Sequence, residues 1–126
     1  MAHILVIDDD TQIRLMITLA LERDGHKVTA AGDGEEGLQL FMDDPPDLVI
    51  TDIIMPRAEG LEVIKKMMQV VDDIPIVAMS GGGRSTTSGD LLPLAKLMGA
   101  RATLTKPFTR AELMQALITA TGEGGV

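Results

Sequence analysis

The chain has 126 residues, of which 45% are hydrophobic, and its 19 acidic and 11 basic residues give a formal net charge of −8 at pH 7. Its length and hydrophobic content predict one packed domain rather than a disordered segment, and its acidity argues against direct binding to nucleic acid, whose phosphates attract basic surfaces. The absence of cysteine excludes disulfides, thiolate metal sites and a cysteine nucleophile.

Apolar segments alternate with amphipathic segments along the first half of the chain. The predicted elements are, in order, a strand over 3–7, a helix over 11–23, a strand over 27–31, a helix from 34 to about 42 and a strand over 48–51. Asp10 or Thr11 is expected to cap the first helix, which Gly25 ends. Asp33 is expected to cap the second helix, with Glu36 three residues further on as in a capping box.

The second half continues the same alternation. Its predicted elements are a turn over 56–60, a helix over 61–70, a strand over 74–79, a helix from Asp90 to Gly99, a strand over 102–105 and a final helix. Thr109 and Glu112 form a capping box at the start of that final helix. We expect one domain over residues 1–121 and a flexible, glycine-rich tail over 122–126.

Five strands that alternate with five helices predict an α/β fold. Successive parallel strands need crossover connections, so the pattern indicates a parallel sheet with helices on both faces. Of the two common doubly wound orders, five strands fit the flavodoxin-like order 2-1-3-4-5, and we expect a (βα)5 sandwich. In that order the first and third strands are neighbours at the switch point of the sheet. Ligands of such folds bind there, at the carboxyl ends of the strands.

Acidic side chains follow those two neighbouring strands. Asp8 and Asp9 come after the first strand, and Asp52 comes after the third. Close carboxylates repel one another by roughly 4 kcal/mol per pair near a surface, so either their pKa values rise or a cation lies among them. If a cation is present, an all-oxygen ligand set suits Mg²⁺ better than Zn²⁺. Ser80 and Lys106 follow the fourth and fifth strands at the same edge. The sequence therefore predicts a phosphoryl-binding pocket with a carboxylate nucleophile.

With these residues, the chain resembles the receiver domain of two-component response regulators, of the chemotaxis type with a single domain, over essentially its whole length. Each matching motif is weak alone, but their order and spacing together are specific. The motifs are Asp8-Asp9, Asp52 with Met55-Pro56 and Gly60, Ser80, Gly99-Ala100 and Lys106-Pro107-Phe108.

The resemblance implies that Asp52 is a phosphoacceptor. It would receive a phosphoryl group from a histidine kinase or a histidine phosphotransfer protein, after which the domain switches conformation to control an output protein. The implied ligands of Mg²⁺, which Mn²⁺ can replace, are Asp9, Asp52, Asp8 through a water, and the backbone carbonyl of Ile54.

The resemblance implies two further roles at the phosphoryl group. Lys106 pairs first with the acceptor carboxylate and then with the phosphoryl oxygens, and the Lys106–Pro107 peptide is cis. Ser80 turns inward to bond the phosphoryl group and moves the loop that follows it. The implied protein is a signalling domain that assists its own phosphotransfer and autodephosphorylation, rather than an enzyme with a separate substrate.

The sequence also bears on location and assembly. No apolar run approaches the ~20 residues that cross a bilayer, and no signal peptide opens the chain. We therefore expect a cytoplasmic protein without membrane contact, as a monomer or weak dimer, whose output partner the sequence does not name. A stand-alone switch and the N-terminal domain of a longer regulator both fit the sequence.

Two departures from the family pattern concern the output of the switch. Thr103 stands where the family usually has a tyrosine or phenylalanine that moves inward with the hydroxyl residue, so readout by an aromatic ring is not expected. The segment from Ser80 to Gly99 is longer than the compact family pattern. Its glycines are compatible with a moving element and equally with a tolerated surface insertion.

Other functions are also compatible with parts of this pattern. A metal-dependent phosphatase with an aspartate nucleophile usually has a second acid two residues later, where Ile54 stands here. A receiver that binds partners without phosphorylation would not need an intact set of acids, hydroxyl and lysine. A nucleotide-binding module is not favoured, because no phosphate-loop motif follows the first strand. The structural alternatives for single residues are Asp8 or Asp10 as a helix cap, Ser80 as a turn residue and Lys106 as a surface lysine.

Position 54 is expected to set the lifetime of the phosphorylated state. Because Ile54 has no polar side chain to orient an attacking water, we predict slow autodephosphorylation. The Ile54→Asn variant should lose its phosphoryl group faster than the wild type, as measured by the decay of the phosphorylated fraction after the donor is removed. A variant slower than the wild type would contradict this interpretation.

Overall fold

A five-stranded parallel sheet forms the centre of the structure, a computed structural model that describes residues 2–53, 60–81 and 93–122. Its strand order is β2-β1-β3-β4-β5, and every neighbouring pair is parallel. The strands are β1 (His3–Ile7), β2 (Lys27–Ala31), β3 (Leu48–Asp52), β4 (Ile76–Ser80) and β5 (Ala102–Thr105). The predicted flavodoxin-like fold and strand order are confirmed.

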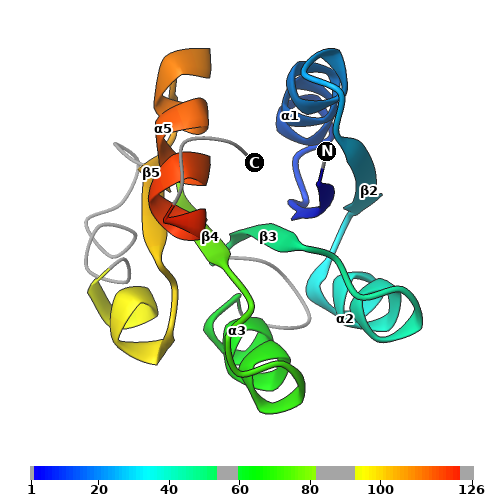
Figure 1. The fold of residues 1–126 in the computed structure, drawn as a ribbon, viewed down its shortest axis with the longest axis vertical. Coiled ribbons are helices and arrows are strands. Elements are labelled where there is room, and N and C mark those ends of the chain that lie inside the picture. Colours follow the sequence, from blue (N-terminus) through cyan, green and yellow to red (C-terminus); the bar gives the residue numbers. More distant parts are fainter. Residues whose placement is uncertain (1, 54–59, 82–92, 123–126) are drawn as a thin grey trace.

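Helices cover both faces of this sheet (Figure 1). The labelled helices are α1 (Thr11–Arg23), α2 (Gly34–Asp43), α3 (Gly60–Val70) and α5 (Arg110–Thr121), and residues 93–98 are also helical. α1 and α5 pack on one face, whereas α2, α3 and the helical segment 93–98 pack on the other. The sheet is therefore the middle of three layers, as doubly wound folds require.

The central strands are buried on both faces, because their side chains alternate between two hydrophobic clusters. In β1, Ile4 and Val6 pack on the α1–α5 side, while Leu5 and Ile7 pack on the α2–α3 side. Each of these four side chains is at most 1% exposed. Two-sided burial explains why the strands are continuous apolar runs rather than alternating patterns.

Two strand boundaries differ from the predictions and affect the site. β3 includes Asp52 as its last residue, whereas the predicted strand ends at residue 51, and the Asp52 side chain is buried. β4 begins at Ile76 instead of Ile74, because Pro75 has no N–H for the sheet ladder, and it includes Ser80. Asp52 and Ser80 are therefore held by strand backbone instead of by loops.

Capping residues determine where three helices begin. Asp10, not Thr11, is the N-cap of α1, and its carboxylate accepts hydrogen bonds from two backbone N–H groups of the first turn. The capping box of Thr109 and Glu112 is confirmed at α5. At α2, Asp33 is the N-cap as expected, and its carboxylate accepts a hydrogen bond from the Glu36 N–H. The Glu36 carboxylate accepts from the N–H of Gly32, the residue before the cap, whereas in a regular capping box it would accept from the N–H of the cap residue itself.

The apolar stripe of α1 is only partly buried. Ile17 and Leu21 are fully buried, but the apolar Met16 in the same helix is 44% exposed. Gly25 has a φ of 90°, the left-handed conformation predicted after the end of this helix. Packing against β1 and β2 thus decides which part of the stripe is covered.

Several predicted features lie outside the described residues. They are the turn before Gly60, the Ile54 carbonyl, the segment 82–92 with the Asp90 cap, and the tail after Gly122. Within the described residues, no helix is both long enough and apolar enough to cross a membrane.

Gly60 begins α3 directly against the end of β3. A Cβ atom on Gly60 would lie 2.1 Å from the Ile53 Cα and 2.4 Å from the Asp52 carbonyl oxygen. Because both neighbours are backbone atoms, Gly60→Ala should lower the free energy of unfolding by at least about 2 kcal/mol, measured by urea denaturation. Gly81→Ala is the control, since no atom of the described residues lies within 4 Å of its Cβ position. Equal denaturation midpoints for Gly60→Ala and the wild type would contradict this packing.

Candidate functional site

The predicted carboxylates meet at the carboxyl ends of β1 and β3. These strands pair in parallel with Ile7 opposite Thr51, so the next residues, Asp8 and Asp52, are neighbours across the sheet. The Asp8 N–H donates to the Ala31 carbonyl at the end of β2, at 3.1 Å. The strand order thus brings together acids that lie far apart in the sequence.

Asp8, Asp9 and Asp52 form a compact acidic cluster. One carboxylate oxygen from each lies within 4.8 Å of those of the other two. Asp8 is completely buried and Asp52 is 5% exposed, whereas Asp9 is exposed. The cluster therefore has a buried base and one solvent-facing acid, through which an ion can reach it.

Lys106 supplies positive charge to this cluster. Its Nζ lies 2.7 Å from Asp8 Oδ2 and 2.9 Å from Asp52 Oδ2. The Lys106 N–H donates to the Ser80 carbonyl at 2.8 Å, which fixes the lysine backbone to the end of β4. The Lys106–Pro107 peptide is cis, as the resemblance implied. One ammonium group therefore bridges the two most buried acids.

Burial and the ion pair shift the pKa of Asp8 in opposite directions, and the same holds for the pKa of Lys106. Burial raises the pKa of Asp8 above its ordinary value of 3.8, and the Asp52 carboxylate adds to that, whereas hydrogen bonds from Lys106 and the Asp10 N–H offset it only in part. Burial acts to lower the pKa of Lys106, but its interactions with Asp8 and Asp52 outweigh burial and raise it above 10.5. Lys106 is therefore a cation at neutral pH, while an ionised Asp8 is costly to hold in the folded protein.

Ser80 is completely buried at the end of β4. β4 lies next to β3 with Met79 opposite Asp52, so Ser80 follows one residue beyond the acid. Among the described residues, its Oγ has no hydrogen-bond partner. A buried hydroxyl without a partner costs about 1–3 kcal/mol, and a ligand oxygen at this edge would offset that cost.

Arg14 supports the cluster, although no sequence motif points to it. Its Nη1 donates to the Asp8 carbonyl at 2.7 Å and so holds the peptide that joins Asp8 to Asp9. The Asp10 N–H donates to Asp8 Oδ1 at 2.8 Å. In the sequence, the only sign of this role is that Arg14 lies one turn after the cap of α1. The fold shows that its side chain extends to the end of β1.

The arrangement fits a divalent cation with oxygen ligands. Ligand oxygens around Mg²⁺ lie about 2.9 to 4.2 Å apart, because Mg–O bonds are about 2.1 Å long in octahedral geometry. The three carboxylates, with oxygens within 4.8 Å, can supply two direct ligands and a third through a water. The Ile54 carbonyl, the fourth predicted ligand, lies outside the described residues.

The predicted acids, hydroxyl and lysine thus share one edge of the sheet. The side chains that lie close together there are Asp8, Asp9, Asp52 and Lys106, with Ser80 at the end of the neighbouring strand. Asp10 is separate, because its carboxylate caps α1. An edge with this composition can hold a nucleophilic carboxylate beside the cation and hydroxyl that bind a phosphoryl group.

The chain matches the family model described as the response regulator receiver domain over residues 4–118. It is similar to the response regulator MprA of Mycolicibacterium vanbaalenii, with 39% identity over 112 residues, which are 89% of this chain and 47% of that protein. MprA of Mycobacterium bovis is 37% identical over 112 residues, again 89% of this chain and 47% of the relative. The chain therefore spans about half the length of the curated relatives it matches.

Solved structures show the same likeness. A response regulator receiver domain protein from Clostridium thermocellum is 33% identical, with a TM-score of 0.87 over 97% of this chain and 95% of that one. NtrX from Brucella abortus is 29% identical, with a TM-score of 0.88 over 96% of this chain and 27% of that one. The chemotaxis protein CheY4 of Vibrio cholerae is 29% identical, with a TM-score of 0.82 over 95% of this chain and 98% of that one.

The raised pKa of Asp8 predicts a gain in stability when its charge is removed. In the metal-free protein at neutral pH, Asp8→Asn should unfold at a higher temperature than the wild type, because the amide has the same shape and no charge to desolvate. The folded state binds the Asp8 proton more tightly than the unfolded state does. The difference should therefore grow as the pH rises from 3.8 toward the higher folded-state pKa, and vanish below 3.8.

Thermal unfolding in EDTA, followed by circular dichroism, measures this difference. Asp10→Asn is the control, because asparagine caps a helix as well as aspartate does and this residue is exposed. Added Mg²⁺ should stabilise the wild type more than Asp8→Asn. If Asp8→Asn were less stable than the wild type in EDTA, the ionised Asp8 would have to be favourable in the folded state, contrary to this account.

Proposed function

The chain belongs to the response regulator receiver family, and we propose that it works as a phosphoacceptor switch in which Asp52 receives the phosphoryl group. The donor is a phosphohistidine on a histidine kinase or on a histidine phosphotransfer protein. The observation that carries this proposal is the Lys106 ammonium group held between Asp8 and Asp52, at 2.7 and 2.9 Å. It offsets part of the negative charge of the buried acids before the reaction and lies within reach of a phosphoryl group on Asp52.

Transfer to Asp52 depends on position and charge neutralisation more than on covalent catalysis. An Asp52 oxygen attacks the phosphorus, and the P–N bond to the donor imidazole breaks with its electron pair left on the imidazole nitrogen. Lys106 then exchanges a hydrogen bond to the Asp52 carboxylate for one to a phosphoryl oxygen. The domain thus acts on itself, as a signalling domain and not as an enzyme with a separate substrate.

Mg²⁺ is the proposed cofactor of this transfer. Asp9 and Asp52 would bind it directly and Asp8 through a water, with the Ile54 carbonyl as a further ligand. When bound, the ion withdraws negative charge from the phosphoryl oxygens. The short separation of the three carboxylates supports this ligand set, and Mn²⁺, which also prefers oxygen ligands, can replace Mg²⁺.

Ser80 completes the proposed switch. Because its buried Oγ has no partner in the part of the chain that the structure describes, a phosphoryl oxygen on Asp52 would satisfy it and draw Ser80 toward the site. Thr103 on the neighbouring β5 is half-buried and has no aromatic ring to follow this movement. The output must therefore use other residues than a ring at position 103.

Further properties are proposed from the same family membership. Residues 1–121 form the receiver domain, which controls an output protein or output domain and is expected in the cytoplasm, as a monomer or weak dimer. Hydrolysis of the Asp52 phosphoryl group by the protein itself returns the switch to its resting state. The MprA relatives are about twice as long as this chain, which leaves room in such proteins for an output domain.

A metal-dependent phosphatase with an aspartate nucleophile is the competing function. Such an enzyme needs a general acid near Asp52 to protonate each leaving group. Position 54, where that acid usually stands, is isoleucine, and Asp8 is already paired with Lys106. These residues favour a phosphoryl group that stays on Asp52 over rapid turnover.

Incubation with acetyl phosphate and Mg²⁺, followed by intact-protein mass spectrometry, tests the proposal. The wild type should gain one phosphoryl group, and Asp52→Asn should gain none, because an amide is not a nucleophile. Asp10→Asn is the matched control, since the same substitution in a helix cap at the same edge should leave phosphorylation unchanged.

Two results would refute the phosphoacceptor function. One is the absence of an adduct on the wild type with both acetyl phosphate and a phosphorylated histidine phosphotransfer protein. The other is continuous release of inorganic phosphate from a phosphate monoester, which would favour the phosphatase.

A further inference from the structure

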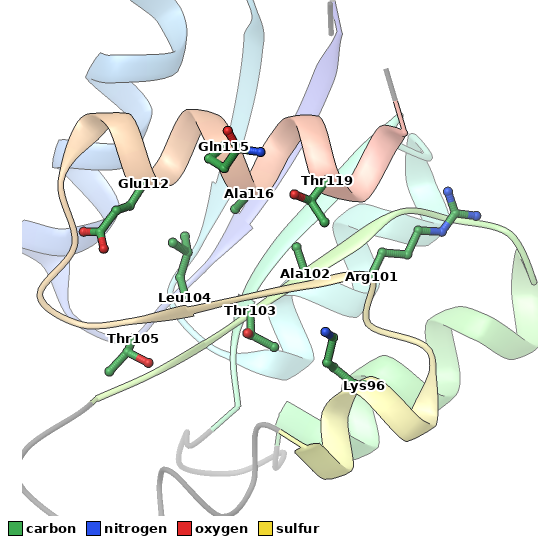
Figure 2. A pocket seen from close by; sticks show the side chains of 10 residues that line it. All are labelled: Lys96, Arg101, Ala102, Thr103, Leu104, Thr105, Glu112, Gln115, Ala116 and Thr119. Carbon is green, nitrogen blue, oxygen red and sulfur yellow. The ribbon is translucent and has the colours of Figure 1, made fainter. Parts of the chain in front are cut away.

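A groove of about 440 Å³ lies along β5, an edge strand of the sheet, between the helical segment 93–98 and α5 (Figure 2). The residues that line it come from β5, from α5, and from Lys96 and Arg101 before the strand. None of the three acids of the site is among them. The side chains that hold the acidic cluster in place lie elsewhere, at the ends of β1 and β2.

The segment 8–10 is held by hydrogen bonds on both sides of Asp9. Before Asp9, the Asp8 N–H donates to the Ala31 carbonyl at 3.1 Å, and the Asp8 carbonyl accepts from Arg14 Nη1 at 2.7 Å. After Asp9, the Asp10 N–H donates to Asp8 Oδ1 at 2.8 Å, and the Asp10 carbonyl accepts from the Arg14 N–H at 3.0 Å. Arg14 thus contributes to the fixation of the backbone on both sides of this exposed acid.

The guanidinium group of Arg14 lies between the ends of two strands. On one side is the Asp8 carbonyl, and on the other is Gly32, directly after β2. A Cβ atom on Gly32 would lie 3.4 Å from Arg14 Nη1 and 3.8 Å from Arg14 Cζ. The Gly32 N–H donates to Glu36 Oε1 at 2.8 Å, which connects this turn to the first turn of α2. The guanidinium group therefore has a defined place, and the lack of a side chain on Gly32 leaves room for it.

The charge of Arg14 does not explain this position. Among the described residues its guanidinium group forms no ion pair. A cation near the cluster repels a divalent ion, so the charge of Arg14 alone would weaken the binding of Mg²⁺. The hydrogen bond to the Asp8 carbonyl is therefore the interaction through which Arg14 can favour the site.

We propose that Arg14 is a positioning residue for the divalent cation, which holds the Asp8–Asp9 peptide so that the Asp9 carboxylate stays beside Asp8 and Asp52. This inference rests on the Mg²⁺ site proposed above. Asp52 is the last residue of β3 and Asp8 directly follows β1, whereas Asp9 lies one residue further from the sheet and is exposed.

A fixed peptide favours metal binding because less conformational freedom is lost when the ion binds. Residues that orient the ligands of a metal commonly change its affinity by about 10- to 100-fold when they are substituted. The expected contribution of Arg14 is therefore opposite in sign to the effect of its charge. This difference in sign separates a positioning role from an electrostatic one.

Mn²⁺ binding to the unphosphorylated protein tests this role. Free Mn²⁺ is measured by electron paramagnetic resonance in a titration without a phosphoryl donor. Arg14→Met has a side chain of similar length without donors or charge, and it should bind Mn²⁺ about tenfold more weakly than the wild type. Arg14→Lys keeps the charge and one donor group, and its affinity should lie between the two.

A second pair of variants moves the guanidinium group without a change in charge. In Gly32→Val, the methyl groups beyond the Cβ atom would occupy the space beside Arg14 Nη1, so Mn²⁺ should bind more weakly. Gly32→Ala is its control, because its Cβ atom would lie at contact distance and should leave the affinity unchanged. Arg23→Met is the control for Arg14→Met, because it makes the same substitution at an exposed position of α1 and should bind like the wild type.

Thermal unfolding in EDTA identifies the variants that are folded at the temperature of the titration. A purely structural role of Arg14 would lower stability and leave the Mn²⁺ affinity of the folded protein unchanged. Equal or tighter binding by Arg14→Met, or equal weakening by Arg23→Met, would overturn the proposal. If Arg14→Met does not fold, wild-type affinity in Gly32→Val would overturn it.

Failure of this proposal differs from failure of the phosphoacceptor function. A wild type that binds no Mn²⁺ would overturn the role of Arg14 together with the metal site. A wild type that binds Mn²⁺ but gains no phosphoryl group from any donor would refute the phosphoacceptor function alone, and the comparison of the Arg14 variants would still decide the role of this residue.

Discussion

The Lys106 ammonium group between two buried carboxylates is the interaction on which the site depends. Asp8 and Asp52 are neighbours across the sheet, and both are too buried for water to screen their repulsion. Lys106 compensates them at 2.7 and 2.9 Å. The three residues stand at the ends of β1, β3 and β5, so the ion pair requires the strand order that places these ends at one edge.

The single positive charge of Lys106 does not balance the negative charges of three carboxylates. The pKa of Asp8 stays raised because burial outweighs its contact with Lys106, and Asp9 adds a further negative charge at the surface. This remaining negative charge is what a divalent cation would neutralise. Among the described residues the Ser80 hydroxyl has no hydrogen-bond partner, which is a second local imbalance that a phosphoryl oxygen would remove. The buried carboxylates and the Ser80 hydroxyl therefore destabilise the resting site, and ligands at this edge would offset that cost.

β5 connects this edge to the rest of the surface. It ends beside Lys106, and its open side forms the floor of the groove lined by Lys96 and Arg101.

The sequence by itself determined the fold class and the strand order, and it singled out the acids, the serine and the lysine that the structure places at one edge of the sheet. Its apolar runs alternate with capped amphipathic helices, and the acids, Ser80 and Lys106 each end a strand or directly follow one. Only the tertiary structure decided that Asp52 is buried, that Lys106 bridges it to Asp8, that Arg14 holds the Asp8 carbonyl and that a groove opens along β5. The physical reason is that burial and ion pairing depend on distances between elements remote in the chain, which local patterns do not contain.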